Sequence, residues 1–241
     1  MPREPLPKWD RSADLDRIRA TYVDYAADGR ERLWDMSNAG YARLSHDLGQ
    51  RLLSAIRKSL PHERRGRVLD LGCGTGRLVD DVVGAGMGPA WIGVDLRQEA
   101  VAEARVAYPG VDFLAASADD LPLEDRSVDV VVAQLLFSSL PSVPLERAVA
   151  REIGRVLCPG GWLVWLDLRY DNPVNRAVHG IDARRLGSLF PGWAVQVERA
   201  GLLPPLARRL GLLAPVAYPA LAAVPPLRSH LVGRLRPQTT P

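Results

Sequence analysis

The densest group of residues that could take part in chemistry is a glycine-rich stretch, residues 70–76, which reads DLGCGTG. Glycine lets a backbone adopt positive φ angles and approach a ligand closely. The apolar run 68–71 predicts a buried strand, so the glycines follow a strand's carboxyl end, where open α/β sheets bind ligands. Asp95 follows the next apolar run, and its carboxylate can accept hydrogen bonds from both hydroxyls of a ribose. Two alternatives stay open: Asp95 could cap the helix expected from about Gln98, and the glycine stretch could be a turn without a ligand.

The spacing of the glycines distinguishes two kinds of nucleotide site. A dinucleotide fingerprint, G-x-G-x-x-G, needs its third glycine at position 77, which holds Arg77. The observed pattern, D-x-G-x-G-x-G, resembles motif I of the class I S-adenosylmethionine-dependent methyltransferases. This resemblance implies a loop that wraps the amino-acid part of the cofactor, with Asp70 orienting its ammonium end.

Three later segments resemble the same family at compatible spacing: residues 116–122 (ASADDLP), 125–132 (DRSVDVVV) and 152–161 (EIGRVLCPGG). The resemblance covers about residues 65–168 and is strongest to the branch with small-molecule and quinone-ring methyltransferases. Ser117 stands where the family usually has an acidic residue near the adenine; turn chemistry explains the following Asp119 and Asp120 equally well. The implied cofactor is S-adenosylmethionine, with S-adenosylhomocysteine as product. The implied cofactor-binding residues are Asp70, Gly72, Cys73, Gly74, Gly76, Asp95, Leu96, Ser117, Ala118 and Gln134.

Methyl transfer needs an aligned nucleophile, and a hydroxyl nucleophile benefits from a general base. His179, in the polar segment after the fifth expected strand, is the candidate base; the alternative is a surface loop with an incidental histidine. Family members often have histidines where this chain has Phe137, so we expect an apolar acceptor pocket. Helix packing explains Tyr22 as well as a substrate contact does, and metal-ligand spacing is absent, so no metal site is expected. The candidate substrate-binding residues are Tyr22, Trp34, Phe137 and Tyr170.

Apolar periodicity predicts the elements that position these residues. Helical spacing marks residues 14–27 and about 40–60, and short apolar runs then alternate with helical stretches. This alternation predicts an α/β, Rossmann-like fold: a seven-stranded, mostly parallel sheet with helices on both faces and an N-terminal helical lid. One of the last two strands should be antiparallel. Expected strands are 68–71, 91–94, 111–115, 128–133, 162–168, 194–199 and 230–235. Three core helices are expected: one that ends near residue 83, one that ends near residue 107, and one that spans about 145–157.

Composition limits the organisation of the chain and its partners. The length of 241 residues suits a lid segment (1–62) and a methyltransferase core (63–241) that carries an apolar helical insertion at about 204–227. Residues 210–227 lack charge, but four prolines interrupt them, so we expect short helices and no membrane partner; a surface for an apolar substrate is the alternative. Two cysteines and no signal sequence predict a cytoplasmic protein. The net charge of +3 is spread along the chain, so no nucleic-acid partner is expected.

These observations predict a methyltransferase that acts on a small-molecule acceptor, with an oxygen as the favoured atom. Carbon and nitrogen acceptors stay open, as does the oligomeric state. Two other functions fit parts of the sequence: an NAD(P)-dependent oxidoreductase, against which Arg77 counts, and a non-catalytic S-adenosylmethionine-binding module. The glycine stretch and Asp95 would be kept in a binding module too.

Overall fold

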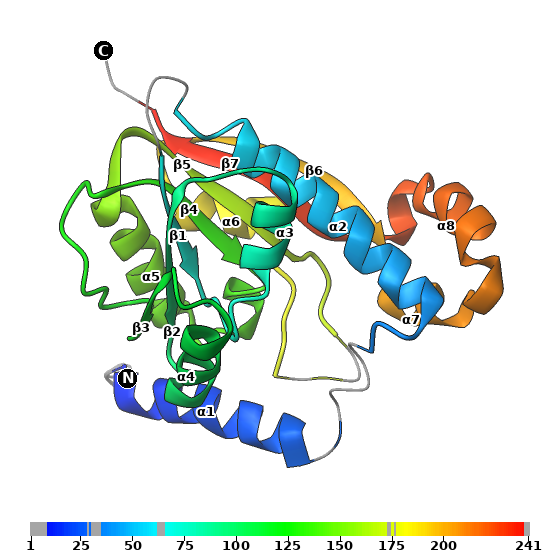
Figure 1. The fold of residues 1–241 in the computed structure, drawn as a ribbon, viewed down its shortest axis with the longest axis horizontal. Helices are drawn as coiled ribbons and strands as arrows, with labels where there is room; N and C mark the ends of the chain where they lie inside the picture. Colours follow the sequence, from blue (N-terminus) through cyan, green and yellow to red (C-terminus); the bar gives the residue numbers. More distant parts are fainter. Residues whose placement is uncertain are drawn as a thin grey trace, which may run out of the picture.

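A seven-stranded sheet forms the centre of the molecule in the computed structural model, which describes residues 9–27, 29, 35–61, 66–172, 175 and 177–238 (Figure 1). The strand order is β3-β2-β1-β4-β5-β7-β6, and β7 is antiparallel to both of its neighbours while the other pairings are parallel. This confirms the predicted Rossmann-like α/β class. The strands are β1 (Arg67–Leu71), β2 (Ala90–Asp95), β3 (Asp112–Ala115), β4 (Val128–Gln134), β5 (Leu157–Leu168), β6 (Trp193–Leu202) and β7 (Arg228–Pro237).

Helices cover both faces of the sheet, and each face has its own apolar cluster. One cluster holds α2, α3 and α4, and the other holds α5, α6 and part of α1. Because both faces are covered, the central strands are apolar along their length, and Val130, Val131 and Val132 are fully buried. The helices are α1 (Arg11–Ala27), α2 (Ala39–Arg57), α3 (Leu78–Gly84), α4 (Gln98–Ala107), α5 (Val143–Val156), α6 (Ala183–Leu189), α7 (Pro204–Arg209) and α8 (Ala214–Ala222), with short 3-10 helices η2 (Phe137–Ser139), η3 (Gly211–Leu213) and η4 (Pro225–Leu227).

The predicted N-terminal lid divides into two elements with different positions. α1 lies across the lower end of the fold in Figure 1, beside the site described below. α2 instead packs along the sheet, because its apolar stripe, which includes Leu44, Leu52 and Ile56, joins the cluster around β1, β4 and β5. The expectation that residues 1–62 form one lid segment therefore differs from the structure: α2 is part of the core.

The predicted apolar insertion connects β6 to β7 and consists of α7, η3, α8 and η4. Prolines begin α7, and Pro215 lies in the first turn of α8, where a missing backbone N–H costs no helical hydrogen bond. Among the described residues, no helix combines the length and apolar character needed to cross a bilayer. The insertion projects from the right-hand side of the molecule in Figure 1 and packs against α2.

Candidate functional site

The glycine stretch forms the turn between β1 and α3. Gly72, Gly74 and Gly76 have φ angles of 80°, 53° and 81°, which non-glycine residues rarely adopt. The backbone N–H groups of Gly72 and Cys73 both donate to the carbonyl of Val94, at 2.7 and 3.0 Å. The turn is therefore attached to the end of β2.

Gly76 serves packing within this turn. A Cβ atom at this position would lie 2.9 Å from the ring of Phe113 and 3.0 Å from that of Tyr108. Gly76 is buried, so the third glycine of the motif lets the turn close over β3. The backbone next to the pocket belongs to the first glycine, Gly72.

The Asp95 carboxylate joins the turn to the start of α4. One oxygen accepts the N–H of Gly74 at 2.8 Å, and the other accepts the N–H of Arg97 at 2.9 Å. The N-cap residue of α4 is Arg97, so the helix-cap interpretation of Asp95 is wrong. The side chain of Asp95 keeps 11% of its surface exposed, and the residue lines the pocket. Asp95 thus orders the turn and still presents its edge to a ligand.

Asp70 is a buried carboxylate without a hydrogen-bond partner among the described residues. Burial, and then the neighbouring Asp95 carboxylate, raise the pKa of Asp70 to about 7. A buried carboxylate beside another carboxylate is stabilised by a cation. The two carboxylates therefore suit a ligand that brings an ammonium group near Asp70, below the turn, and a ribose to Asp95 on the pocket wall, and S-adenosylmethionine has both groups.

A pocket of about 740 Å³, including its open mouth, lies at the carboxyl ends of β1 and β4, the neighbours between which the strand order changes direction. Ligands of doubly wound sheets bind at such a switch point. Six of the predicted cofactor-binding residues line this pocket. They are Gly72, Asp95, Leu96, Ser117, Ala118 and Gln134.

The remaining predicted cofactor-binding residues, Asp70, Cys73, Gly74 and Gly76, lie in or below the turn and do not line the pocket. Cys73 is buried in the apolar cluster on the α2 side of the sheet. Burial raises the pKa of its thiol well above the usual range, so this cysteine packs as an apolar side chain.

Asp119 anchors α1 beside the predicted adenine residue. Its carboxylate accepts the Ser117 hydroxyl, and it pairs with Arg11 of α1, whose Nη2 donates at 3.0 Å. The Arg11 and Ser117 hydrogen bonds outweigh burial and hold the pKa of Asp119 below its usual value. The Ser117 hydroxyl donates to Asp119, so toward an adenine it can act only as an acceptor, and the adenine role of Ser117 and Ala118 stays a prediction. The turn interpretation of Asp119 did not include this contact with α1.

α1 forms one wall of the pocket through Leu15, Ile18 and Tyr22. The guanidinium of Arg97 lies over the ring of Tyr22, 4.1 Å from its centroid. Burial raises the pKa of Tyr22. Tyr22 thus lies on the pocket wall, and its contact with a substrate stays a prediction, whereas Trp34 falls outside the described residues.

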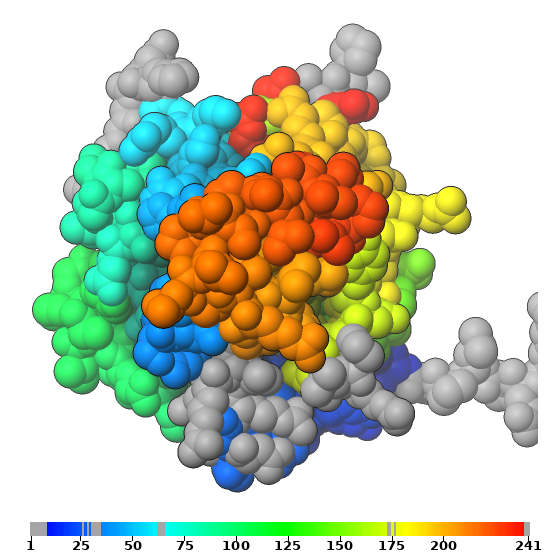
Figure 2. Space-filling model, turned by 90° about the vertical axis from the view of Figure 1, so that its right-hand side faces the viewer, coloured from blue at the N-terminus to red at the C-terminus, as the bar shows by residue number. Residues whose placement is uncertain are grey.

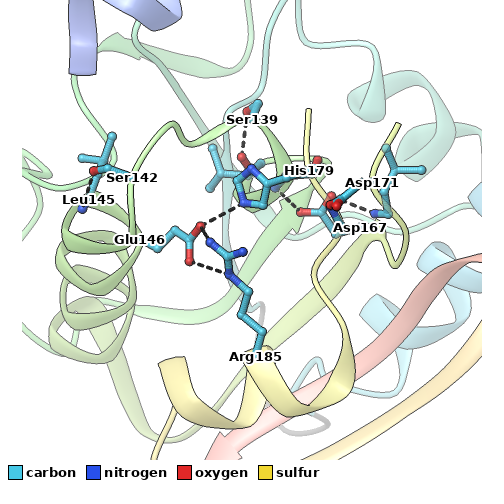
Figure 3. Close-up of polar contacts among 12 residues, drawn as sticks. Ser139, Ser142, Leu145, Glu146, Asp167, Asp171, His179 and Arg185 are labelled. Atoms are coloured by element: carbon cyan, nitrogen blue, oxygen red, sulfur yellow. Dashed lines mark hydrogen bonds and ion pairs between the residues drawn. The ribbon is translucent and has the colours of Figure 1, made fainter. Parts of the chain in front are cut away.

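His179 lies behind the pocket wall, in a cluster of polar side chains (Figure 3). Its Nε2 is 2.9 Å from Oε1 of the fully buried Glu146 on α5, and its backbone N–H donates to the Ser138 carbonyl. Arg185 of α6 holds the same carboxylate, with Nε donating to Oε2 at 3.1 Å. The His179 ring does not line the pocket. Ser139 and Leu145 do line it, and they are the chain neighbours of Ser138 and Glu146, which contact His179.

Glu146 and Arg185 were not predicted from the sequence, although one signal pointed to Glu146. Glu146 occupies a position in the apolar stripe of α5, with Val149, Ala150 and Ile153 on the same side. A carboxylate in such a stripe must be paired to be buried. The partner could not be identified from spacing, because α6 is seven residues long and was not predicted.

Two predicted substrate-binding residues lie away from the pocket. Phe137 is fully buried, with its ring centroid 4.5 Å from that of Trp165 and 5.9 Å from that of Phe190. It belongs to the core because η2 turns its side chain toward β5. Tyr170 is exposed beneath the Arg169 guanidinium, and its hydroxyl donates to the Pro226 carbonyl at 3.3 Å.

Comparison with known proteins agrees with this geometry. A family profile described as "Methyltransferase domain" matches residues 69–165. A phthiotriol/phenolphthiotriol dimycocerosates methyltransferase of Mycobacterium ulcerans is 34% identical over 110 residues, which are 45% of this chain and 40% of that protein. A malonyl-[acyl-carrier protein] O-methyltransferase of Methylococcus capsulatus is 34% identical over 129 residues, 52% of this chain and 45% of that protein. The match thus spans less than half the length of either curated relative.

A solved structure described as a SAM-dependent methyltransferase from Methanosarcina mazei has the same fold, with a TM-score of 0.57 and 19% identity over 77% of this chain and 97% of that one. Profile and fold together indicate a class: residues 69–165 match a methyltransferase domain, and the fold around them is shared with a solved S-adenosylmethionine-dependent methyltransferase. The cofactor of this class is S-adenosylmethionine, and its product is S-adenosylhomocysteine.

Proposed function

We propose that the protein transfers the methyl group of S-adenosylmethionine to an oxygen atom of a small, apolar acceptor. The observation that carries this proposal is the composition of the pocket beyond its nucleoside-facing residues. That part is walled by apolar side chains from α1, the segment after β4 and α5. They are Leu15, Ile18, Leu136, Leu140, Leu145 and Val149.

The chemistry asks little of the protein beyond alignment. S-adenosylmethionine supplies an electrophilic methyl group, and the chain must hold an acceptor in line with the bond that breaks. Orientation of this kind can lower a barrier by about 7–11 kcal/mol. An apolar wall keeps water away while positive charge leaves the sulfur. Asp70 and Asp95 would hold the ammonium group and the ribose of the cofactor.

We place His179 as the general base for an acceptor hydroxyl. If Glu146 accepts the proton on Nε2, the neutral ring has Nδ1 as its proton-accepting nitrogen. Arg185 holds Glu146 in place, so the carboxylate that orients the ring is itself fixed by a charged partner. The acceptor would have to reach between Ser139 and Leu145 to contact the ring.

The relatives support this choice of acceptor. One is named as a methyltransferase of phthiotriol dimycocerosates and the other as an O-methyltransferase of a malonyl group on acyl-carrier protein. Carried over to this chain, these names favour an apolar acceptor and an oxygen as the methylated atom.

The test is incubation with methyl-labelled S-adenosylmethionine and a panel of apolar alcohols, phenols and acids. We expect label in ethers or esters, and we expect His179→Ala to lower kcat by about 10²–10⁴-fold while leaving the affinity for S-adenosylhomocysteine unchanged. His46→Ala, on the exposed side of α2, is the matched control. Unchanged turnover in His179→Ala would remove it as the base, and label on carbon or nitrogen would contradict the oxygen acceptor. Cofactor binding without any label transfer would favour a binding module.

A further inference from the structure

The insertion between β6 and β7 exposes an apolar surface that packing of the monomer does not use. Leu212, Leu213 and Val216 have 96%, 69% and 81% of their surfaces exposed. Val224 and five exposed prolines of the insertion extend this surface. Figure 2 shows α7, η3 and α8 (orange) protruding toward the viewer as one convex knob, residues 204–227, which we call the insertion knob.

The inner side of the insertion knob is firmly held, so its outer side is not exposed by loose packing. Tyr218 is buried, accepts the backbone N–H of Leu202 at 3.3 Å and donates to Asp47 of α2 at 3.0 Å. At the other end, Arg228 donates to the carbonyls of Ala222 and Ala223 at the end of α8. The exposed leucines therefore belong to an ordered element.

The C-terminal part of the sequence, from Arg199 onward, carries positive charge only. All 28 acidic residues precede Arg199, and residues 199–241 contain six arginines and no acidic residue. Two of these arginines, Arg208 and Arg209, lie in the last turn of α7, directly before the exposed leucines. Arg209 is exposed and has no ion-pair partner among the described residues. The apolar surface is thus bordered by positive charge.

We propose that the insertion knob docks on the surface of an anionic lipid bilayer. An exposed apolar surface beside basic side chains is the arrangement by which an interfacial helix binds such a surface. A convex tip needs no complementary groove in its partner, and an acyl layer provides none. We expected no membrane partner because prolines and short helices in this segment rule out a membrane span. They do not rule out contact with the surface of a bilayer.

Docking in this way would bring the lipid to the edge of the sheet on which the pocket opens. β6 runs parallel to β5, so the insertion follows a strand's carboxyl end. Tyr170, in the segment after β5, contacts the insertion through the Pro226 carbonyl. The docking proposal is independent of the proposed function, because vesicle binding and methyl transfer are measured separately.

The test is sedimentation of the full chain with vesicles of phosphatidylcholine mixed with phosphatidylglycerol, compared with vesicles of phosphatidylcholine alone. We expect binding to the anionic vesicles, weakened at about 1 M salt, where the Debye length falls to about 3 Å. Combining Leu212→Glu with Leu213→Glu should lower the vesicle affinity at least about tenfold with an unchanged Tm, because neither side chain is buried. Arg209→Glu should lower it as well.

Val106→Glu is the matched control, because Val106 is 84% exposed on α4, outside the insertion. It should bind vesicles as the unaltered chain does. If the double variant failed to fold, Val216→Glu would be measured in its place. Absence of binding to anionic vesicles, or equal binding by the glutamate variants, overturns the proposal. Self-association that the same variants abolish, without vesicle binding, would overturn it too and assign the surface to a second copy of the chain.

Discussion

Asp70 and Asp95 are two neighbouring carboxylates with opposite environments. Asp95 accepts backbone hydrogen bonds from Gly74 and Arg97, whereas Asp70 is buried without a hydrogen-bond partner among the described residues. A carboxylate in that position costs folding free energy whenever it is ionised. We interpret this cost as the sign of a site that a cationic ligand completes.

The predicted effect of Asp70→Asn is a gain of stability for the ligand-free protein. Burial raises the pKa of Asp70 in the folded protein to about 7, above its value of about 4 in the unfolded chain. The free energy of unfolding of the unaltered chain should therefore fall as pH rises from about 4 to about 7, because over that range Asp70 ionises more readily in the unfolded chain. The variant cannot ionise, so its stability advantage should grow across that window and reach on the order of 4 kcal/mol above it. Denaturant unfolding at several pH values measures it.

The same variant should lose the stabilisation that S-adenosylhomocysteine gives the unaltered chain, because the partner of the ligand's ammonium group is gone. Glu124→Gln, in the segment between β3 and β4, is a control for a change of surface charge. A variant that is less stable than the unaltered chain at pH 8 would show that Asp70 has a stabilising partner in the fold.

At the scale of the elements, two glycines allow the turn, β2 and β3 to pack closely against one another. A Cβ atom at Gly93 would lie 2.4 Å from the ring of Phe113 and 2.9 Å from Sγ of Cys73. The ring of Phe113 also covers Gly76, so two glycines from different segments make room for one aromatic side chain. The packing of β2 against the turn depends on this arrangement.

We therefore expect Gly93→Ala to lower the free energy of unfolding by about 1–3 kcal/mol, because the ring must move in a filled core. Gly187→Ala is the matched control: Gly187 is in helix α6, no atom lies within 4 Å of the place that a Cβ atom would take, and alanine should add about 0.5–1 kcal/mol. Urea unfolding of both variants makes the comparison. Equal stability of Gly93→Ala and the unaltered chain would mean that Phe113 is not confined.

The elements could be predicted from local patterns, and the contacts between them could not. Period and turn residues placed all seven strands and α1–α5, because helix and strand spacing is a property of short segments. The pairing of Arg11 with Asp119 and that of Glu146 with His179 join residues that are 108 and 33 positions apart. Phe137 was misplaced for the same reason: its burial depends on Trp165 and Phe190, which come from other elements.

At the scale of the whole molecule, the sheet order brings the functional residues to one edge. Gly72 follows β1, Asp95 ends β2 and Gln134 ends β4, so parallel neighbours deliver them to one pocket. α1 covers this pocket, and the insertion knob lies at the carboxyl end of β6. The molecule thus combines a nucleoside site, an apolar wall and an exposed apolar surface at the carboxyl edge of its sheet.

The central claim is that this edge of the sheet binds the methyl donor, and calorimetry with S-adenosylhomocysteine tests it most directly. We predict saturable binding by the folded chain and at least about a tenfold loss of affinity, about 1.4 kcal/mol, in Asp95→Ala. Asp112→Ala, exposed at the start of β3, should bind as the unaltered chain does. Absence of binding by the folded protein, or an Asp95→Ala variant that binds equally well, would contradict the claim.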